Sequence, residues 1–271
     1  MPTFSPNLDL QMHYEIDDHT DPWSSCETVM LMHGNAESLE AWRSWIPALS
    51  RTYRVLRADM RGFGRSTAMP RGYKWSVERI MQDFYDLLEH LQIKKVHLVG
   101  AKVGGTLAFQ FAAMYPHKVA TLTTIGAPVS GSASLGERIP SWLEHIEKHG
   151  VESWARWTMP GRMGEDFSPA GSEYWAKLMG KTAASTQLSF IETVPSVDVT
   201  AVLSTIQCPT LVITSENSNL GNAQEVEAWR KLIPSSKLLL LKGSSYHPAA
   251  SDADICSNAT LKFIQDHPIV I

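Results

Sequence analysis

The stretch Val96-His97-Leu98-Val99-Gly100-Ala101-Lys102-Val103-Gly104-Gly105-Thr106-Leu107-Ala108 joins two different patterns. Its first half is an apolar run rich in valine, which is typical of a buried strand. The run stops at Gly100, and an apolar helical pattern follows the pair Gly104 and Gly105. The stretch therefore predicts a strand, a sharp turn and a helix, with Lys102 at the turn.

The same alternation of strand and helix recurs along the chain. Apolar runs predict strands at 28–32, 53–58, 119–125, 210–214 and 237–241. Apolar residues at helical spacing predict helices at 77–91, 223–233 and 252–266. Residues 8–16 alternate loosely, as an edge strand would. Strands separated by helices in this way predict a parallel sheet with right-handed crossovers, a fold of the α/β class.

The pattern changes between residues 130 and 200. This segment predicts helices near 141–149, 151–157, 172–182 and 184–193, and it shows no buried strand. We predict that residues 1–129 and 201–271 form the core and that residues 130–200 form a helical cap. The cap would lie over the edge of the sheet that carries Lys102. The alternative, that this segment simply continues the main core, stays open at this point.

Composition narrows the classes of function. The 271 residues are 44% hydrophobic, which suits one domain with an insertion. The net charge of -4, without a basic stripe, disfavours nucleic acid as a partner. No signal peptide or membrane span is evident, so we expect a cytoplasmic protein, monomer or homodimer, with no membrane contact. The three cysteines lack metal-ligand spacing, and we expect reduced thiols, no metal and no cofactor.

Three motifs together resemble the α/β-hydrolase fold superfamily. They are His33-Gly34 after a strand, the loop Asp59-Met60-Arg61-Gly62-Phe63-Gly64-Arg65-Ser66, and the turn Gly100-Ala101-Lys102-Val103-Gly104. The resemblance runs from about residue 10 to 266. Within the superfamily, the chain looks most like the branch of lactonases, C–C hydrolases and haloperoxidase-like proteins. It implies a mostly parallel central sheet flanked by helices. It also implies a nucleophile elbow, Gly-x-Ser-x-Gly, in which Lys102 here replaces the serine.

The resemblance assigns further site residues. The backbone N–H groups of Asn35 and Val103 would form the oxyanion hole, with the N-terminus of a helix behind Val103. His247, between the last strand and the last helix, would be the catalytic histidine. Ser218 takes the place of the usual acid, although Glu216 is close enough to replace it. The serine, histidine and aspartate of the family thus become Lys102, His247 and Ser218.

The two changes are consistent with each other. In a serine hydrolase the acid stabilises the cationic imidazole that forms when the serine loses its proton. A neighbouring lysine would disfavour that cation by charge repulsion, so an acid would lose its purpose. The pattern is that of a rebuilt site.

Lys102 can serve several kinds of chemistry. Burial and positive surroundings lower the pKa of a lysine, and a neutral amine can form a Schiff base with a ketone. The amine can also act as a general base, or remain protonated and bind an anion or enolate. Attack on an ester would give a stable amide, so simple covalent esterase turnover is the chemistry that Lys102 disfavours.

Residues around the predicted pocket have both structural and functional interpretations. We expect five side chains near the substrate: His33, Trp142, Trp157, Arg162 and Met163. Aromatic and methionine side chains in such a cap are as often packing residues. Glu37 and Glu40 would flank the mouth of the pocket, and Arg61 and Arg65 would tie loops together by ion pairs.

These observations predict a cofactor-independent enzyme that acts on a small carbonyl substrate. A lactone, an enol ester or a β-dicarbonyl compound would be opened or cleaved by hydrolysis, with Lys102 in place of the serine. A lyase or decarboxylase on the same fold is the nearest alternative. The other class of function is a receptor or carrier that binds a small molecule without catalysis.

Overall fold

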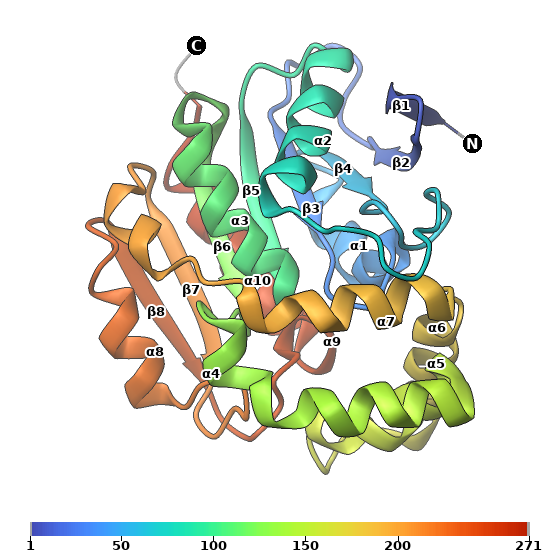
Figure 1. Ribbon diagram of the computed structural model, residues 1–271. Coiled ribbons are helices and arrows are strands. Elements are labelled where there is room, and N and C mark those ends of the chain that lie inside the picture. The colour runs from blue at the N-terminus through green and yellow to red at the C-terminus, as the bar shows by residue number, and fades with distance from the viewer. Residues whose placement is uncertain (1, 270–271) are drawn as a thin grey trace.

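The computed structural model describes residues 2–269, and an eight-stranded sheet forms its centre (Figure 1). The strand order is β1-β2-β4-β3-β5-β6-β7-β8. β2 runs antiparallel to β1 and β4, and the strands from β4 to β8 are parallel. The sequence thus predicted the fold class correctly. The strands are β1 (Thr3–Asn7), β2 (Leu10–Asp17), β3 (Thr28–Met32), β4 (Arg54–Ala58), β5 (Val96–Ala101), β6 (Val119–Ile125), β7 (Thr210–Ser215) and β8 (Ser236–Leu241).

Alternate residues of the buried strands pack on opposite faces of the sheet, as the pleat requires. In β3, Met30 packs with one cluster of helices and Leu31 with the other. The first face is covered by α2 (Val77–His90), α3 (Val103–Met114) and α8 (Ala223–Arg230). The second is covered by η1 (Leu39–Trp45), α1 (Ile46–Leu49) and α10 (Ala253–Gln265).

Four helices and three short 3-10 helices separate β6 from β7, in the segment where the sequence predicts a cap. They gather at one end of the sheet in Figure 1 and bury a separate apolar cluster. α5 is broken at Gly150 (φ 82°), so its two helical parts correspond to the two helices predicted near 141–149 and 151–157. The elements are α4 (Gly131–Leu135), η3 (Gly136–Arg138), α5 (Ile139–Met163), α6 (Pro169–Gly180), α7 (Ala184–Thr193), η4 (Val194–Ser196) and η5 (Thr200–Thr205).

The carboxyl ends of the parallel strands meet beneath these helices. Residues that follow β3, β5, β6, β7 and β8 line one pocket together with residues of the helices between β6 and β7. Two short elements complete the chain: η2 (Pro116–Lys118) and α9 (Pro248–Ser251). Over residues 2–269, no helix combines the length and the apolar character that crossing a membrane requires.

The contact between α3 and β3 leaves no room for a side chain at Gly104. A Cβ there would overlap the backbone carbonyl oxygens of Met32 and His33, which cannot move without shifting the strand. We expect Gly104→Ala to lower the free energy of unfolding by about 2–3 kcal/mol. Chemical denaturation measures this loss. Gly136→Ala, whose Cβ would meet only Ser132 Oγ at 3.8 Å, is the control and should change stability little. Equal stability of the two variants would contradict the close contact.

Candidate active site

Lys102 occupies a strained turn between β5 and α3. Its backbone has φ 53° and ψ -125°, a conformation that residues other than glycine rarely adopt. The turn is held by hydrogen bonds: the Lys102 N–H donates to Ile125 O (2.9 Å), and the Lys102 carbonyl accepts from the Gly105 N–H (2.9 Å). This geometry directs the lysine side chain into the pocket, as an elbow directs a nucleophile.

A buried carboxylate that follows β3 joins the lysine to the histidine. Lys102 Nζ donates to Glu37 Oε1, and Nε2 of His247 lies 3.1 Å from the same oxygen. The second carboxylate oxygen accepts from the Gly34 N–H (2.9 Å). A Cβ at Gly34 would lie 2.5 Å from Lys102 Cε, so only glycine leaves space for the lysine. Lys102, Glu37 and His247 therefore form one cluster, and each is less than 5% exposed.

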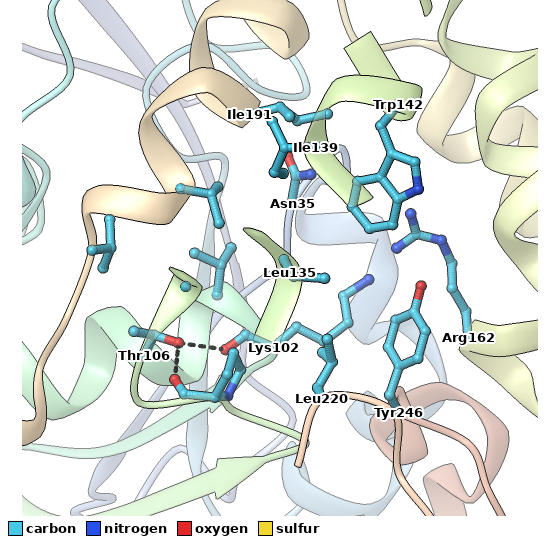
Figure 2. Close-up of a pocket in the computed structure, with 15 residues that line it drawn as sticks. Asn35, Lys102, Thr106, Leu135, Ile139, Trp142, Arg162, Ile191, Leu220 and Tyr246 are labelled. Atoms are coloured by element: carbon cyan, nitrogen blue, oxygen red, sulfur yellow. Dashed lines mark hydrogen bonds between the residues drawn. The ribbon is translucent and has the colours of Figure 1, made fainter. Parts of the chain in front are cut away.

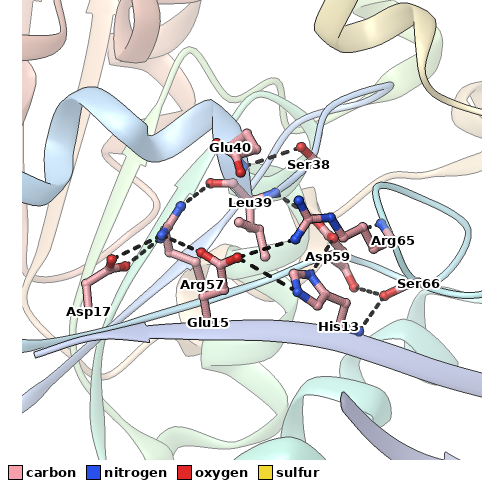
Figure 3. Close-up of polar contacts among 10 residues, drawn as sticks. All are labelled: His13, Glu15, Asp17, Ser38, Leu39, Glu40, Arg57, Asp59, Arg65 and Ser66. Carbon is pink, nitrogen blue, oxygen red and sulfur yellow. Dashed lines mark hydrogen bonds and ion pairs between the residues drawn. The ribbon is translucent and has the colours of Figure 1, made fainter. Parts of the chain in front are cut away.

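The loop from 59 to 66 fixes the segment that carries Glu37. Asp59 Oδ1 accepts from the Leu39 N–H (2.7 Å), two residues beyond Glu37. Asp59 Oδ2 accepts from the Arg65 N–H (2.8 Å) and lies 3.0 Å from Nδ1 of His13 (Figure 3). These contacts place the carboxylate of Glu37 against the lysine and leave its side chain little freedom.

Burial sets the protonation of the cluster. It raises the pKa of Glu37, but the charge of Lys102 and the contact with His247 outweigh it and hold that pKa well below its usual value. Burial lowers the pKa of Lys102 to about 8, against the opposing effect of Glu37. Burial and the charge of Lys102 lower the pKa of His247 to about 4. At neutral pH the cluster holds a carboxylate and a neutral imidazole, and about one-tenth of the lysine is a free amine.

The pocket beside Lys102 has mostly apolar walls and a few polar groups. Figure 2 shows the ammonium of Lys102, the guanidinium of Arg162 and the hydroxyl of Tyr246 pointing toward one space, beside the indole of Trp142. The sequence predicted Trp142 and Arg162 near the substrate, and both line this pocket. The apolar part of the wall is formed by Val103, Pro128, Leu135, Ile139, Ile191, Val194, Val197 and Leu220.

The two predicted oxyanion donors also reach the pocket. Asn35 and Val103 line it together with Lys102. Val103 is the first residue of α3, so its N–H lacks an acceptor within the helix. The buried Asn35 Oδ1 accepts no hydrogen bond from residues 2–269. The preceding N–H, from Gly34, is already bound by Glu37.

The structure does not bring Ser218 to the histidine. The hydroxyl of Ser218 accepts from the Leu220 N–H (3.2 Å) and lies in a different, polar pocket. Nδ1 of His247 has no partner among the described residues, so the predicted contact is absent. Glu216 is exposed and makes no contact with His247 within residues 2–269. The carboxylate that contacts the histidine comes from the loop after β3, not from the loop after β7.

Three of the residues predicted near the substrate do not line this pocket. Both ring nitrogens of the buried His33 are used: Nε2 accepts from the Met60 N–H (3.0 Å), and Nδ1 donates to Gly34 O (2.8 Å). The ring is therefore a neutral structural group. Trp157 is 52% exposed and stacks on the half-buried His145. Met163 packs in the apolar cluster of the cap and borders another pocket.

Sequence reasoning placed Glu37 only at the mouth of the pocket and missed its role. A signal was available, because Glu37 follows the end of β3 as Lys102 follows the end of β5, and the two strands are neighbours in the sheet.

Arg61 was predicted correctly as a structural ion-pair residue, since it binds both oxygens of the buried Asp83 at 2.8 Å. Among residues 2–269, no three histidine, cysteine or acidic side chains gather as metal ligands would.

The ion pair predicts a measurable change in the pKa of Lys102. The charge of Glu37 raises this pKa, so the uncharged isostere in Glu37→Gln should move the midpoint of Lys102 acylation below pH 8. Acetic anhydride labelling across pH, read by mass spectrometry, measures that midpoint. The exposed Lys177 is an internal control whose labelling should be the same in both proteins. An unchanged midpoint for Lys102 would show that the pair does not form.

Known proteins resemble this chain along its length. A family model described as alpha/beta hydrolase fold matches residues 27–189. A protein of Stutzerimonas stutzeri, named as a carbamate hydrolase (RutD), is 26% identical over 90% of this chain and 92% of its own. A 2-hydroxy-6-oxo-2,4-heptadienoate hydrolase of Pseudomonas putida is 39% identical, over 36% of this chain and 37% of its own.

A solved structure supports the same conclusion on the fold. The enol-lactonase of Burkholderia xenovorans LB400 superposes with a TM-score of 0.88 at 21% identity, over 97% of this chain and 100% of that one. The family model covers more than half of the residues and includes the strand, the turn and the helix around Lys102. The chain therefore belongs to the α/β-hydrolase fold family.

Proposed function

We propose that the protein is a hydrolase in which the amine of Lys102 attacks a small carbonyl substrate. The observation that carries this proposal is the cluster itself: a buried lysine with a pKa of about 8, paired to Glu37 and facing an apolar pocket. The names of the relatives support a carbonyl substrate, since they include an oxo-heptadienoate hydrolase and an enol-lactonase.

The first step would be formation of a Schiff base. The Nζ lone pair forms a bond to the ketone carbon, and the carbonyl π electrons move to oxygen, where the N–H groups of Asn35 and Val103 stabilise the charge. A proton passes from Nζ to Glu37 and on to the oxygen. A second proton, taken up from the solvent, lets this oxygen leave as water, and an iminium remains at Lys102.

The second step would cleave a β-dicarbonyl by hydrolysis. His247 is neutral above about pH 4, so its imidazole would act as the base that takes a proton from water. The hydroxide adds to the second carbonyl, and the C–C bond breaks with its electron pair moving into the iminium to form an enamine. The imidazolium of His247 returns its proton to the enamine carbon, and hydrolysis of the resulting iminium releases a ketone and regenerates Lys102. The net reaction consumes one water and yields a carboxylic acid and a ketone.

Two other candidates use the same pocket. Decarboxylation or a retro-aldol cleavage would need only the iminium and no second water, so a lyase is the alternative within this chemistry. A receptor that binds a small molecule without turnover is favoured by the absence of a serine at the elbow. In that case Lys102 would stay protonated and bind an anion.

Product formation from a panel of lactones, enol esters and β-diketones tests the proposal. We expect Lys102→Met to lower turnover by at least about a thousandfold, because the attacking atom is lost. Lys118→Met removes another buried lysine, paired to Glu89 away from the pocket, and should keep full activity. Thermal unfolding confirms that each variant is folded. Tight binding of a panel member without turnover by the unaltered protein would favour the receptor.

The pH dependence provides a second test. The free-amine fraction of Lys102 rises with pH up to its pKa, so adduct formation should increase about tenfold per unit below pH 8 and level off above it. Cyanoborohydride reduction followed by mass spectrometry of the Lys102 peptide gives the rate. A rate that falls between pH 7 and 9 would show that the ammonium is the active form, as an anion-binding role requires.

A further inference from the structure

Arg162 carries a buried positive charge without a carboxylate partner. The residue is 3% exposed, its Nε donates to Thr158 Oγ1 (3.1 Å), and its Nη2 has no partner among the described residues. The other buried arginines differ, because Arg57 binds Asp17 and Arg61 binds Asp83. Among the buried arginines of residues 2–269, Arg162 is therefore the one that forms no ion pair with an aspartate or glutamate.

Aromatic rings surround this guanidinium. Its central carbon lies 4.7 Å from the ring centre of Trp154, 5.6 Å from that of Tyr246 and 5.9 Å from that of Trp142. The faces of these rings attract the positive charge of the guanidinium. They offer no oxygen or nitrogen acceptor for its N–H groups, which point outward in the plane of the guanidinium. A desolvated charge with an unused donor is costly to fold, and a ligand that supplies the opposite charge would offset that cost.

We propose that Arg162 binds the carboxylate of the substrate, so that the substrate of Lys102 is an oxo carboxylic acid and not a neutral diketone or lactone. This inference rests on the proposed function. Arg162 lines the same pocket as Lys102, and the hydroxyl of Tyr246 points to the space between them (Figure 2). A guanidinium and a phenol match the two oxygens of one carboxylate. A phosphate dianion would need more donors than these mostly apolar walls offer.

The backbone of Arg162 also fixes this group relative to the catalytic histidine. Its carbonyl oxygen accepts from the His247 N–H (3.0 Å) and from the hydroxyl of Ser245 (2.8 Å). The end of α5 is therefore tied to the loop that carries His247. The charge of Arg162 acts on Lys102 and His247, lowering the pKa of both, so an anion bound between the cations would relieve their repulsion.

A matched pair of ligands tests the inference. Acetoacetate and pentane-2,4-dione have nearly the same shape, but only the first carries a carboxylate. With cyanoborohydride present, we expect acetoacetate to half-saturate Lys102 adduct formation at about tenfold lower concentration or less. Arg162→Gln should reduce this preference to within about twofold, and Arg162→Lys should keep part of it. Arg156→Gln, on the exposed face of the same helix, should leave it unchanged.

A second measurement separates this inference from the proposed function. Calorimetry of butanoate against butanamide reports carboxylate binding without any reaction at Lys102. Tighter binding of butanoate that disappears in Arg162→Gln supports the inference even if no adduct forms, in which case the proposed function alone fails. Adducts that form equally from both ligands, or a butanoate preference that survives in Arg162→Gln, would overturn the inference. Circular dichroism and thermal unfolding confirm that the variant is folded.

Discussion

The site depends on one carboxylate held away from water. Glu37 contacts both Lys102 and His247 through a single oxygen, while its other oxygen is bound by a backbone N–H. Removing that negative charge would leave a buried ammonium without compensation, which proteins rarely tolerate. The carboxylate therefore makes burial of the lysine possible. Because its charge opposes the effect of burial, the pKa of the lysine falls only to about 8.

The origin of this carboxylate separates the site from the arrangement expected of its family. The resemblance implies an acid in the loop after the strand that is β7 here. In this chain the acid follows β3 and contacts the histidine from the side of the elbow, where it also reaches the lysine. The fold supplies several loops at one edge of the sheet, and a carboxylate can enter from more than one of them.

Local patterns predicted the fold well because strand and helix periodicity depend on neighbouring residues. The strands and most helix positions follow from apolar runs such as 28–32 and 96–101. The partner of Lys102 could not be derived in the same way, since 65 residues separate Glu37 from Lys102 and only the strand order makes them neighbours. Side chains of the cap were the least predictable, because apolar periodicity does not tell which face of α5 meets the pocket. Trp142 lines the pocket, whereas Trp157 on the same helix is exposed.

Because residue 34 is a glycine, the side chain of Lys102 has room to pack against its backbone, and this limits the conformations of the amine. A lysine in solution samples many rotamers, and ordering one costs on the order of 2 kcal/mol. Here the backbone of Gly34 lies against the end of the lysine chain, and Glu37 holds the ammonium at its tip. The rotamer entropy of Lys102 is therefore lost when the protein folds and not when a ligand arrives. In the proposed reaction an incoming carbonyl would meet an amine whose direction is already fixed, so the entropic part of the barrier to attack would be correspondingly smaller.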